Sequence, residues 1–185
     1  MCVAVASLTA APAAMAADVP VVTPPVTAAS LSAALGAPLN VVTGQCRGAA
    51  APRASTARMR RAVRCVINQQ RARVGLNPLA ANRRLARAAS RHARDMARHN
   101  YFSHVSLSGK SPLWRVRAAG WRRGVGEALA WGCGPQASPA AIVAAWLGSA
   151  SHRAIILGRG RVVGIGSKRG AGCSGGRAFV VTEVG

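Results

Sequence analysis

Acidic residues are nearly absent from this chain of 185 residues, which has four Asp and Glu against 25 Lys and Arg and a formal net charge of +21. Only Lys110 and Lys168 are lysines, and the other basic residues are arginines. An arginine fork matches phosphate and carboxylate groups, although the codon usage of a GC-rich genome would produce the same bias. A field this positive attracts polyanions such as nucleic acid, acidic lipid headgroups or anionic cell-wall polymers.

Aromatic residues are also scarce, at 4% of the chain, whereas 50% of the residues are hydrophobic. This length and composition predict one folded domain with a sizeable core. That core must be built mainly from Ala, Val, Leu and Ile, with the four tryptophans as its bulky members.

Long apolar runs are missing beyond the N-terminal segment, since a helix that spans a bilayer needs about 20 such residues. The first seventeen residues carry no charge, and Ala14-Met15-Ala16 matches the small-residue pattern of a signal-peptidase site. We therefore predict a signal peptide over residues 1–17, although it lacks a basic n-region. The mature protein is expected to be secreted, extracellular or at the cell surface, with no transmembrane segment.

The cysteines show no C-x-x-C spacing of the kind that marks zinc or redox sites. Removal of a signal peptide would take Cys2 with it and leave four cysteines, which allow three pairings that sequence alone does not decide. Disulfides suit an exported protein, with unpaired buried thiols as the alternative. Element order favours Cys46–Cys65, which ties an N-terminal arm to the first helix, and Cys133–Cys173 across two strands.

Residues 18–55 form a Pro-, Ala- and Val-rich arm or linker without a sustained period. Helical spacing then runs from Ser55 to Gly75, and a second helix is predicted from Asn82 to His99. Two Ser-Pro pairs mark two more helix starts, because Ser caps a helix and Pro suits its first position; they are Ser111-Pro112 and Ser138-Pro139.

Short strands are predicted late in the chain, over Gly126–Trp131, Val162–Gly166 and Ala178–Thr182. A Gly-rich connection joins the last two, which indicates an antiparallel hairpin. Helices first and interleaved strands later favour an α+β layered domain over a parallel βαβ array.

Three residues stand out as candidates for chemistry: His104, Glu127 and His152, each at a predicted loop or element boundary. Taken singly each is a weak signal, because a lone histidine is more often a packed or surface residue. His92 lies on the apolar stripe of its helix and is expected to be a core histidine. Ser103 and Ser151 adjoin two of the histidines in sequence, but sequence neighbours rarely face each other, so no nucleophile with a paired base is evident.

The order of several motifs resembles the bacterial CAP (SCP-like) domains, which are related to cysteine-rich secretory, antigen 5 and pathogenesis-related proteins. The matching stretches are Cys65–Arg73 with Gly75–Leu79, Leu85–Ala89, Tyr101-Phe102-Ser103-His104, Gly126–Gly132, Trp146 followed by Ser151–Leu157, and Gly164-Ile165-Gly166. The resemblance assigns residues 56–185 to one CAP domain. It implies an αβα sandwich with a small antiparallel sheet between helices, and a cleft where His104, Glu127 and His152 converge.

The chain departs from that pattern at four places. Eukaryotic members usually carry a second glutamate three residues after the tryptophan, where this chain has Ser149. Ala128 and Ile155 replace residues that are commonly Asn, and Ala150-Ser151 replaces Pro-Gly. The cleft therefore holds fewer carboxylates and fewer orienting amides.

Two imidazoles and a carboxylate have the composition of a catalytic zinc site with one open position, so His104 and His152 are candidate ligands for zinc or another divalent metal. The same groups could hold a water for proton transfer. The resemblance to CAP proteins also implies that the chain binds sterols, fatty acids or other lipids. We therefore expect a secreted protein that binds a lipid or other small molecule, more than an enzyme.

Two alternatives remain at this point. One is a metal-dependent hydrolase or protease-like enzyme. The other is a cationic adhesin whose arginine-rich helix over residues 82–99 lies on anionic cell-wall polymer or a phospholipid surface. Nucleic acid is not expected as a partner, because the chain has an export signal and cysteines and lacks a nucleic-acid recognition motif.

Overall fold

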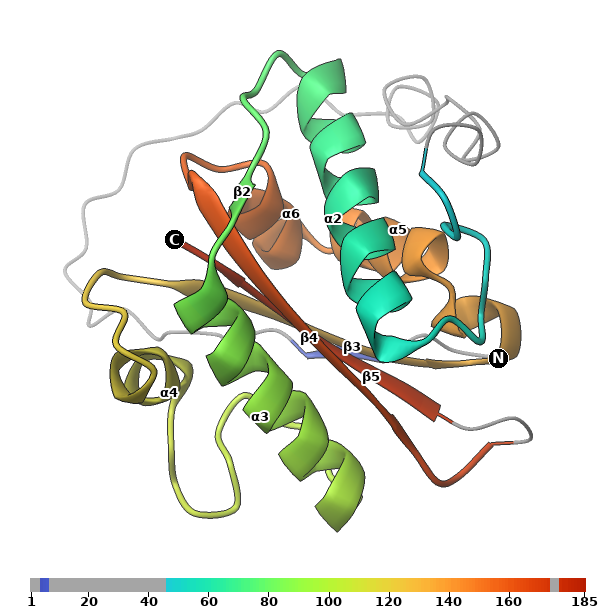
Figure 1. The fold of residues 1–185 in the computed structure, drawn as a ribbon, viewed down its shortest axis with the longest axis vertical. Coiled ribbons are helices and arrows are strands. Elements are labelled where there is room, and N and C mark those ends of the chain that lie inside the picture. Colours follow the sequence, from blue (N-terminus) through green and yellow to red (C-terminus); the bar gives the residue numbers. More distant parts are fainter. Residues whose placement is uncertain (1–3, 7–45, 174–176) are drawn as a thin grey trace, which may run out of the picture.

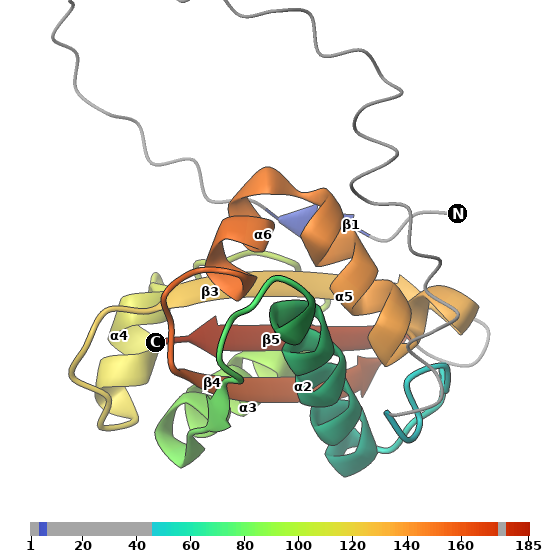
Figure 2. The same ribbon diagram turned by 90° about the horizontal axis from the view of Figure 1, so that it is seen from above.

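The chain folds into three layers with a twisted sheet in the middle (Figures 1 and 2). The structure is a computed structural model that describes residues 4–6, 46–173 and 177–185. One face of the sheet is covered by α2 (Thr56–Arg73), α5 (Pro139–Gly148) and α6 (Ala150–Ile156), and the other by α3 (Arg83–His99), with α4 (Pro112–Ala118) beside it. The predicted αβα sandwich is confirmed.

The sheet has five strands in the order β1-β3-β5-β4-β2. The strands are β1 (Ala4–Ala6), β2 (Ala80–Ala81), β3 (Gly126–Cys133), β4 (Val162–Gly170) and β5 (Arg177–Val184). β4 and β5 form the predicted antiparallel hairpin, and β3 pairs antiparallel with β5. The prediction was an antiparallel sheet, and one pairing differs from it: the two residues of β2 pair parallel with β4.

The segment 1–17, predicted as a signal peptide, contributes the edge strand β1, which pairs antiparallel with Leu129–Trp131 of β3. The other residues of that segment, and residues 18–45 of the arm, lie outside the described residues. The end of the arm is described, and it packs against the domain: Cys46, Ala49 and Ala54 are buried, and Ala140 donates its N–H to the carbonyl of Ala49 at 2.9 Å.

The helix starts follow the predicted capping residues. Ser55 accepts a hydrogen bond from the N–H of Arg58, Asn82 from those of Arg84 and Leu85, Ser111 from that of Trp114, and Ser138 from that of Ala141. Such bonds satisfy backbone donors that have no partner within the helix. Helix α6 was not predicted; Ser149, with extended backbone angles, ends α5 and begins α6, so His152 lies within a helix and not in a loop.

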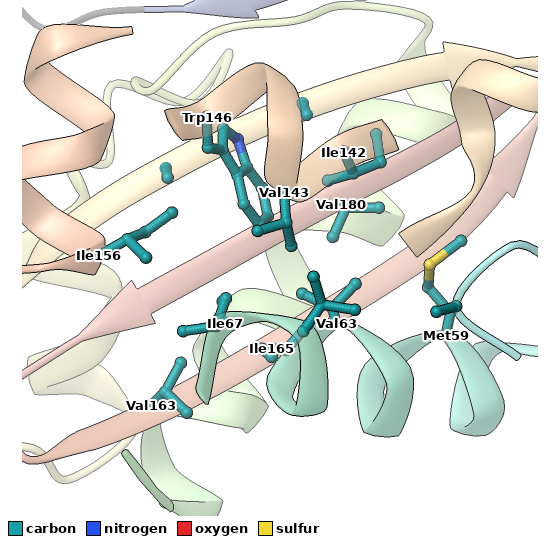
Figure 3. Close-up of a cluster of buried hydrophobic side chains, with 14 of the residues drawn as sticks. Met59, Val63, Ile67, Ile142, Val143, Trp146, Ile156, Val163, Ile165 and Val180 are labelled. Atoms are coloured by element: carbon teal, nitrogen blue, oxygen red, sulfur yellow. The ribbon is translucent and has the colours of Figure 1, made fainter. Parts of the chain in front are cut away.

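The larger core lies between the sheet and the layer of α2, α5 and α6 (Figure 3). Val63 and Ile67 of α2 face Ile142 and Val143 of α5, and the Trp146 indole donates to the carbonyl of Leu129 at 2.9 Å. On the opposite face α3 lies directly on β4. A Cβ at Gly164 or Gly166 would collide with the backbone of α3, so these positions require glycine.

Two disulfides join the predicted cysteine pairs. Cys46 is bonded to Cys65 with their Cα atoms 5.7 Å apart, and Cys133 to Cys173 with theirs 6.0 Å apart. The first ties the segment before α2 to that helix, and the second links the end of β3 to the β4–β5 connection. None of the helices in the described ranges has the length and apolarity needed to cross a membrane.

Candidate functional site

A cluster of three buried polar side chains lies where β3 begins. Glu127 is on β3, Arg115 is on α4, and His104 is in the loop between α3 and α4; each is less than a tenth exposed. His104 Nδ1 lies 2.8 Å from Glu127 Oε1, and Arg115 Nη2 donates to Glu127 Oε2 at 2.5 Å. Both carboxylate oxygens are therefore held by cationic or polar partners. We call His104, Arg115 and Glu127 the buried cluster.

Arg115 also organises the loop that carries His104. Its Nη1 donates to the carbonyl of His104 at 2.7 Å and to that of Lys110 at 2.8 Å. One guanidinium thus connects α4, β3 and both ends of the loop from 104 to 110. Arg115 was not predicted as a site residue, because a single arginine gives no signal in a chain so rich in arginine.

The cluster keeps Glu127 ionised. Burial acts to raise the pKa of Glu127, but the hydrogen bond with His104 and the charge of Arg115 outweigh it and leave the pKa below its ordinary value. The negative charge of Glu127 is therefore compensated inside the protein.

A second buried carboxyl, Glu183 on β5, is the register partner of Glu127 across the antiparallel pair. It is fully buried, and no N–H or hydroxyl group of the described residues donates a hydrogen bond to either of its oxygens. Burial, followed by the charge of Glu127, raises the pKa of Glu183 well above its ordinary value, so its neutral form is favoured. Glu183 was not predicted either, although an acidic residue among the apolar residues of β5 is a usable signal.

The third predicted cleft residue, His152, is buried on α6, and its Nδ1 lies 2.9 Å from Ser149 Oγ. Ser149 stands where eukaryotic relatives carry their second glutamate. The structure thus joins His104 directly to Glu127 and gives His152 a serine hydroxyl as a partner.

A divalent metal does not fit these residues as they are placed. Within residues 4–6, 46–173 and 177–185, no three His, Cys, Asp or Glu side chains are grouped so that they could hold a metal ion. In addition, the guanidinium of Arg115 occupies one oxygen of Glu127.

The other two histidines have structural partners. His92 is buried on the inner face of α3 as predicted, and its Nε2 lies 2.8 Å from the carbonyl of Ser103, next to His104 in the chain. His99 is exposed at the end of α3, where its Nδ1 lies 3.1 Å from both the carbonyl and a carboxylate oxygen of Asp95.

Comparison with known proteins gives a family match, a relative that is similar in sequence, and solved structures with a similar fold. The model of the family described as CAP, the cysteine-rich secretory protein family, matches residues 65–183. The uncharacterized protein YkwD of Bacillus subtilis is 35% identical over 91 residues, which make up 49% of this chain and 34% of YkwD. The chain thus matches about a third of the length of that relative.

The solved structures that share the fold include two proteins from other bacteria. An extracellular protein with an SCP domain from Bacillus anthracis aligns with a TM-score of 0.59 and 23% identity over 70% of this chain and 40% of its own. An outer surface protein from Borrelia burgdorferi aligns with a TM-score of 0.54 and 23% identity over 64% of this chain and 85% of its own. At this identity the likeness concerns the fold alone.

Proposed function

Because this chain belongs to the CAP family of cysteine-rich secretory proteins, we propose that it is an exported protein that binds a lipid or other small molecule in a metal-free cleft around His104, Glu127 and His152. The two disulfides suit an oxidising compartment. The similar structures come from an extracellular protein and an outer surface protein, which supports the same location. The uncharged segment 1–17 would supply the export signal.

The observation that carries the binding proposal is the buried cluster. A carboxylate with both oxygens engaged is poorly available as a metal ligand, but its partners hold the loop in one geometry. Side chains fixed in this way hold the loop and the start of β3 in a preorganised arrangement, which lowers the entropic cost of binding a ligand. His104 is the member of the cluster whose replacement tests this arrangement, because its backbone carbonyl would still accept from Arg115.

The test is to look for a molecule that leaves the bacterium with the protein. The parent and the His104→Ala/His152→Ala variant are exported from the same host, purified in parallel and denatured, and the released small molecules are identified by mass spectrometry. We expect a compound that accompanies the parent in stoichiometric amount and is lost from the variant. Equal extracts from the two folded proteins would refute binding at this cleft.

Surface adhesion is a second candidate, favoured by the arginines of α3. Six of them are exposed, and Asp95 is the one acid on the helix: Arg83, Arg84, Arg87, Arg91, Arg94 and Arg98. Such a face would bind anionic cell-wall polymer or phospholipid through charge. The test measures binding to phosphatidylglycerol vesicles and to phosphatidylcholine vesicles. It also compares the binding of Arg87→Gln/Arg94→Gln/Arg98→Gln with that of a control variant in which three exposed arginines elsewhere, Arg53, Arg58 and Arg73, are replaced by Gln. Binding should vanish in about 1 M salt, where the screening length is about 3 Å.

A hydrolase has one observation in its favour, the contact between Ser149 Oγ and His152 Nδ1 at 2.9 Å. A serine hydroxyl beside an imidazole can be activated as a nucleophile. A fluorophosphonate probe tests this directly, since attack by an activated Ser149 expels fluoride, passes the proton to His152 and leaves a phosphonylated serine. Labelling that is lost in Ser149→Ala would support the enzyme, and an unlabelled parent would exclude a serine nucleophile here.

A further inference from the structure

A pocket of about 270 Å³ lies between α3, the loop that precedes α4, and α4 itself. Neither His104, Glu127 nor His152 is among its lining residues. Arg115 is the link between the two regions, because it lines the pocket and also belongs to the buried cluster. The pocket is therefore a separate place on the protein and does not rest on the function proposed above.

The lining is strongly cationic. Arg91, Lys110 and Arg115 face the pocket with one carboxylate among them, Asp95. Asp95 is already engaged, because it accepts a hydrogen bond from the Tyr101 hydroxyl and pairs with His99. The hydroxyls of Ser106 and Ser108 add neutral hydrogen-bonding groups. Arg115 is paired with Glu127, so Arg91 and Lys110 supply the remaining positive charge, which favours an anionic group in the pocket.

One wall offers an aromatic surface. Trp114 is 50% exposed, which is unusual for so large an apolar side chain, and Lys110 Nζ lies 4.5 Å from the centre of its ring. The methyl groups of Ala88 and Ala118 line the same pocket. A ligand that carries a ring or a short apolar part can therefore bury it against the indole while its charge lies near Lys110.

Two of the lining residues, His92 and Arg115, each have a buried nitrogen without a partner among the described residues. The ring of His92 is 1% exposed, and because Nε2 faces a carbonyl oxygen, that nitrogen must carry the hydrogen and donate it. In the neutral ring Nδ1 is then an acceptor, and it has no partner among the described residues, nor has Nε of Arg115. A buried polar atom left without a partner costs about 1 to 3 kcal/mol.

A ligand would satisfy both nitrogens if it donated a hydrogen bond to Nδ1 of His92 and accepted one from Nε of Arg115. Burial, the largest cause, lowers the pKa of His92, and the charge of Arg115 adds to it, so the ring is neutral and offers an acceptor at neutral pH. An anion that carries a hydroxyl or amino group meets these requirements together.

We propose that this pocket binds a small organic anion, a carboxylate or a phosphate monoester, whose charge lies against Arg91 and Lys110 and whose hydroxyl or amino group donates to His92 Nδ1. The volume of 270 Å³ is just below the range of roughly 300 to 1,000 Å³ typical of ligand pockets. It suits a molecule of one ring, and it is too small for a long acyl chain.

The test uses the oxidised mature protein and four defined probes, 4-hydroxybenzoate, benzoate, phenyl phosphate and the uncharged 4-hydroxybenzyl alcohol. Binding is followed by NMR at the indole N–H of Trp114, identified as the signal that Trp114→Phe lacks. We expect 4-hydroxybenzoate to shift this signal and to bind about fivefold more tightly than benzoate, the effect of one net hydrogen bond of about 1 kcal/mol. The uncharged alcohol should bind at least about tenfold more weakly than 4-hydroxybenzoate.

Matched variants separate the pocket from the general positive charge. Lys110→Ala should weaken the binding of 4-hydroxybenzoate about fivefold. Lys168→Ala removes the same charge from an exposed position on β4 and should leave the affinity for 4-hydroxybenzoate within about twofold. His152→Ala should also retain binding, because His152 is neither in the pocket lining nor bonded to Arg115, and this result distinguishes the pocket from the cleft. The tighter of benzoate and phenyl phosphate identifies the preferred anion. Equal losses in the two lysine variants, or no shift of Trp114 with any probe, would overturn the proposal.

Discussion

Glu127 and Glu183 lie directly opposite each other on the antiparallel strands β3 and β5, and both are buried on the face that α3 covers. Only one of them has a compensating cation, since Arg115 binds Glu127. The favoured state of the pair therefore has a single negative charge, on Glu127. Glu183 is protonated in this state and can donate its hydrogen to Glu127. Several consequences of this arrangement and of the buried arginines can be measured.

Relative to Glu183→Gln, the stability of the protein should fall as the pH rises above the ordinary glutamate pKa of about 4.3, and this comparison cancels the opposite contribution of His92, whose pKa burial lowers. The pKa of Glu183 is raised in the folded state by burial and by Glu127, against the opposing charge of Arg115. Its stabilising contribution is thus complete below the unfolded pKa and is lost as the pH rises through the folded pKa. Glu183→Gln keeps the shape without the ionisation, so it should be more stable than the parent at pH values above the folded pKa.

The measurement is the free energy of unfolding in urea, for the parent and for Glu183→Gln, between about pH 4.5 and pH 8. This range lies above the pH at which Glu127 itself becomes protonated. The difference between Glu183→Gln and the parent should grow with pH. A parent whose free energy of unfolding shows no decline relative to the variant over this range would contradict a neutral Glu183.

Removal of Arg115 should be costly because it leaves a buried carboxylate without its cation. We expect Arg115→Met to lower the free energy of unfolding by about 3 to 5 kcal/mol. Arg117→Met, two residues along the same helix at an exposed position, should change it by less than about 0.5 kcal/mol. Adding Glu127→Gln to Arg115→Met should recover part of the loss, and purely additive losses in the double variant would argue against direct coupling.

Arg71 on α2 fixes the connection between α6 and β4. The side chain is buried, and it donates to four backbone carbonyls, those of Asn77, Ile156, Gly158 and Gly160. Arg71→Met should therefore cost about 3 kcal/mol and increase amide hydrogen exchange around residues 157–161. The exposed Arg73→Met is the control; equal exchange in the two variants would show that Arg71 does not hold this connection.

The two disulfides should contribute unequally, because they close loops of different length. The cysteines are 19 residues apart in the first and 40 in the second. Loop-closure entropy predicts roughly 3 kcal/mol for Cys46–Cys65 and roughly 4 kcal/mol for Cys133–Cys173. Unfolding of each Cys→Ala pair variant measures them, and a larger loss from the first pair would mean that contacts of residues 46–55 with the core outweigh the entropy.

Much of the fold could be predicted because its signals are local. Asn82, Ser111-Pro112 and Ser138-Pro139 begin helices where their capping chemistry predicts, and the β4–β5 hairpin follows its apolar runs. The seven-residue α6 was missed because its start depends on the extended backbone of Ser149, and the parallel pairing of β2 depends on long-range docking.

The site was predictable only in part, for a related reason. The motifs named His104 and Glu127, and the structure joins them at 2.8 Å. Arg115 and Glu183 reach the same place from α4 and from the last strand, and no spacing in the sequence encodes that convergence. Their roles arise from burial and from the charge of their neighbours, which exist only in the folded chain.

The central claim is that the cleft around His104, Glu127 and His152 works without a metal, and zinc titration by calorimetry tests it most directly. The oxidised mature protein is titrated beside His104→Ala/His152→Ala, which retains His92 and the exposed His99 as background. We predict the same negligible or weak heats from both proteins. Zinc binding at one site in the parent that disappears in the double variant would contradict this account and make the cleft a metal centre.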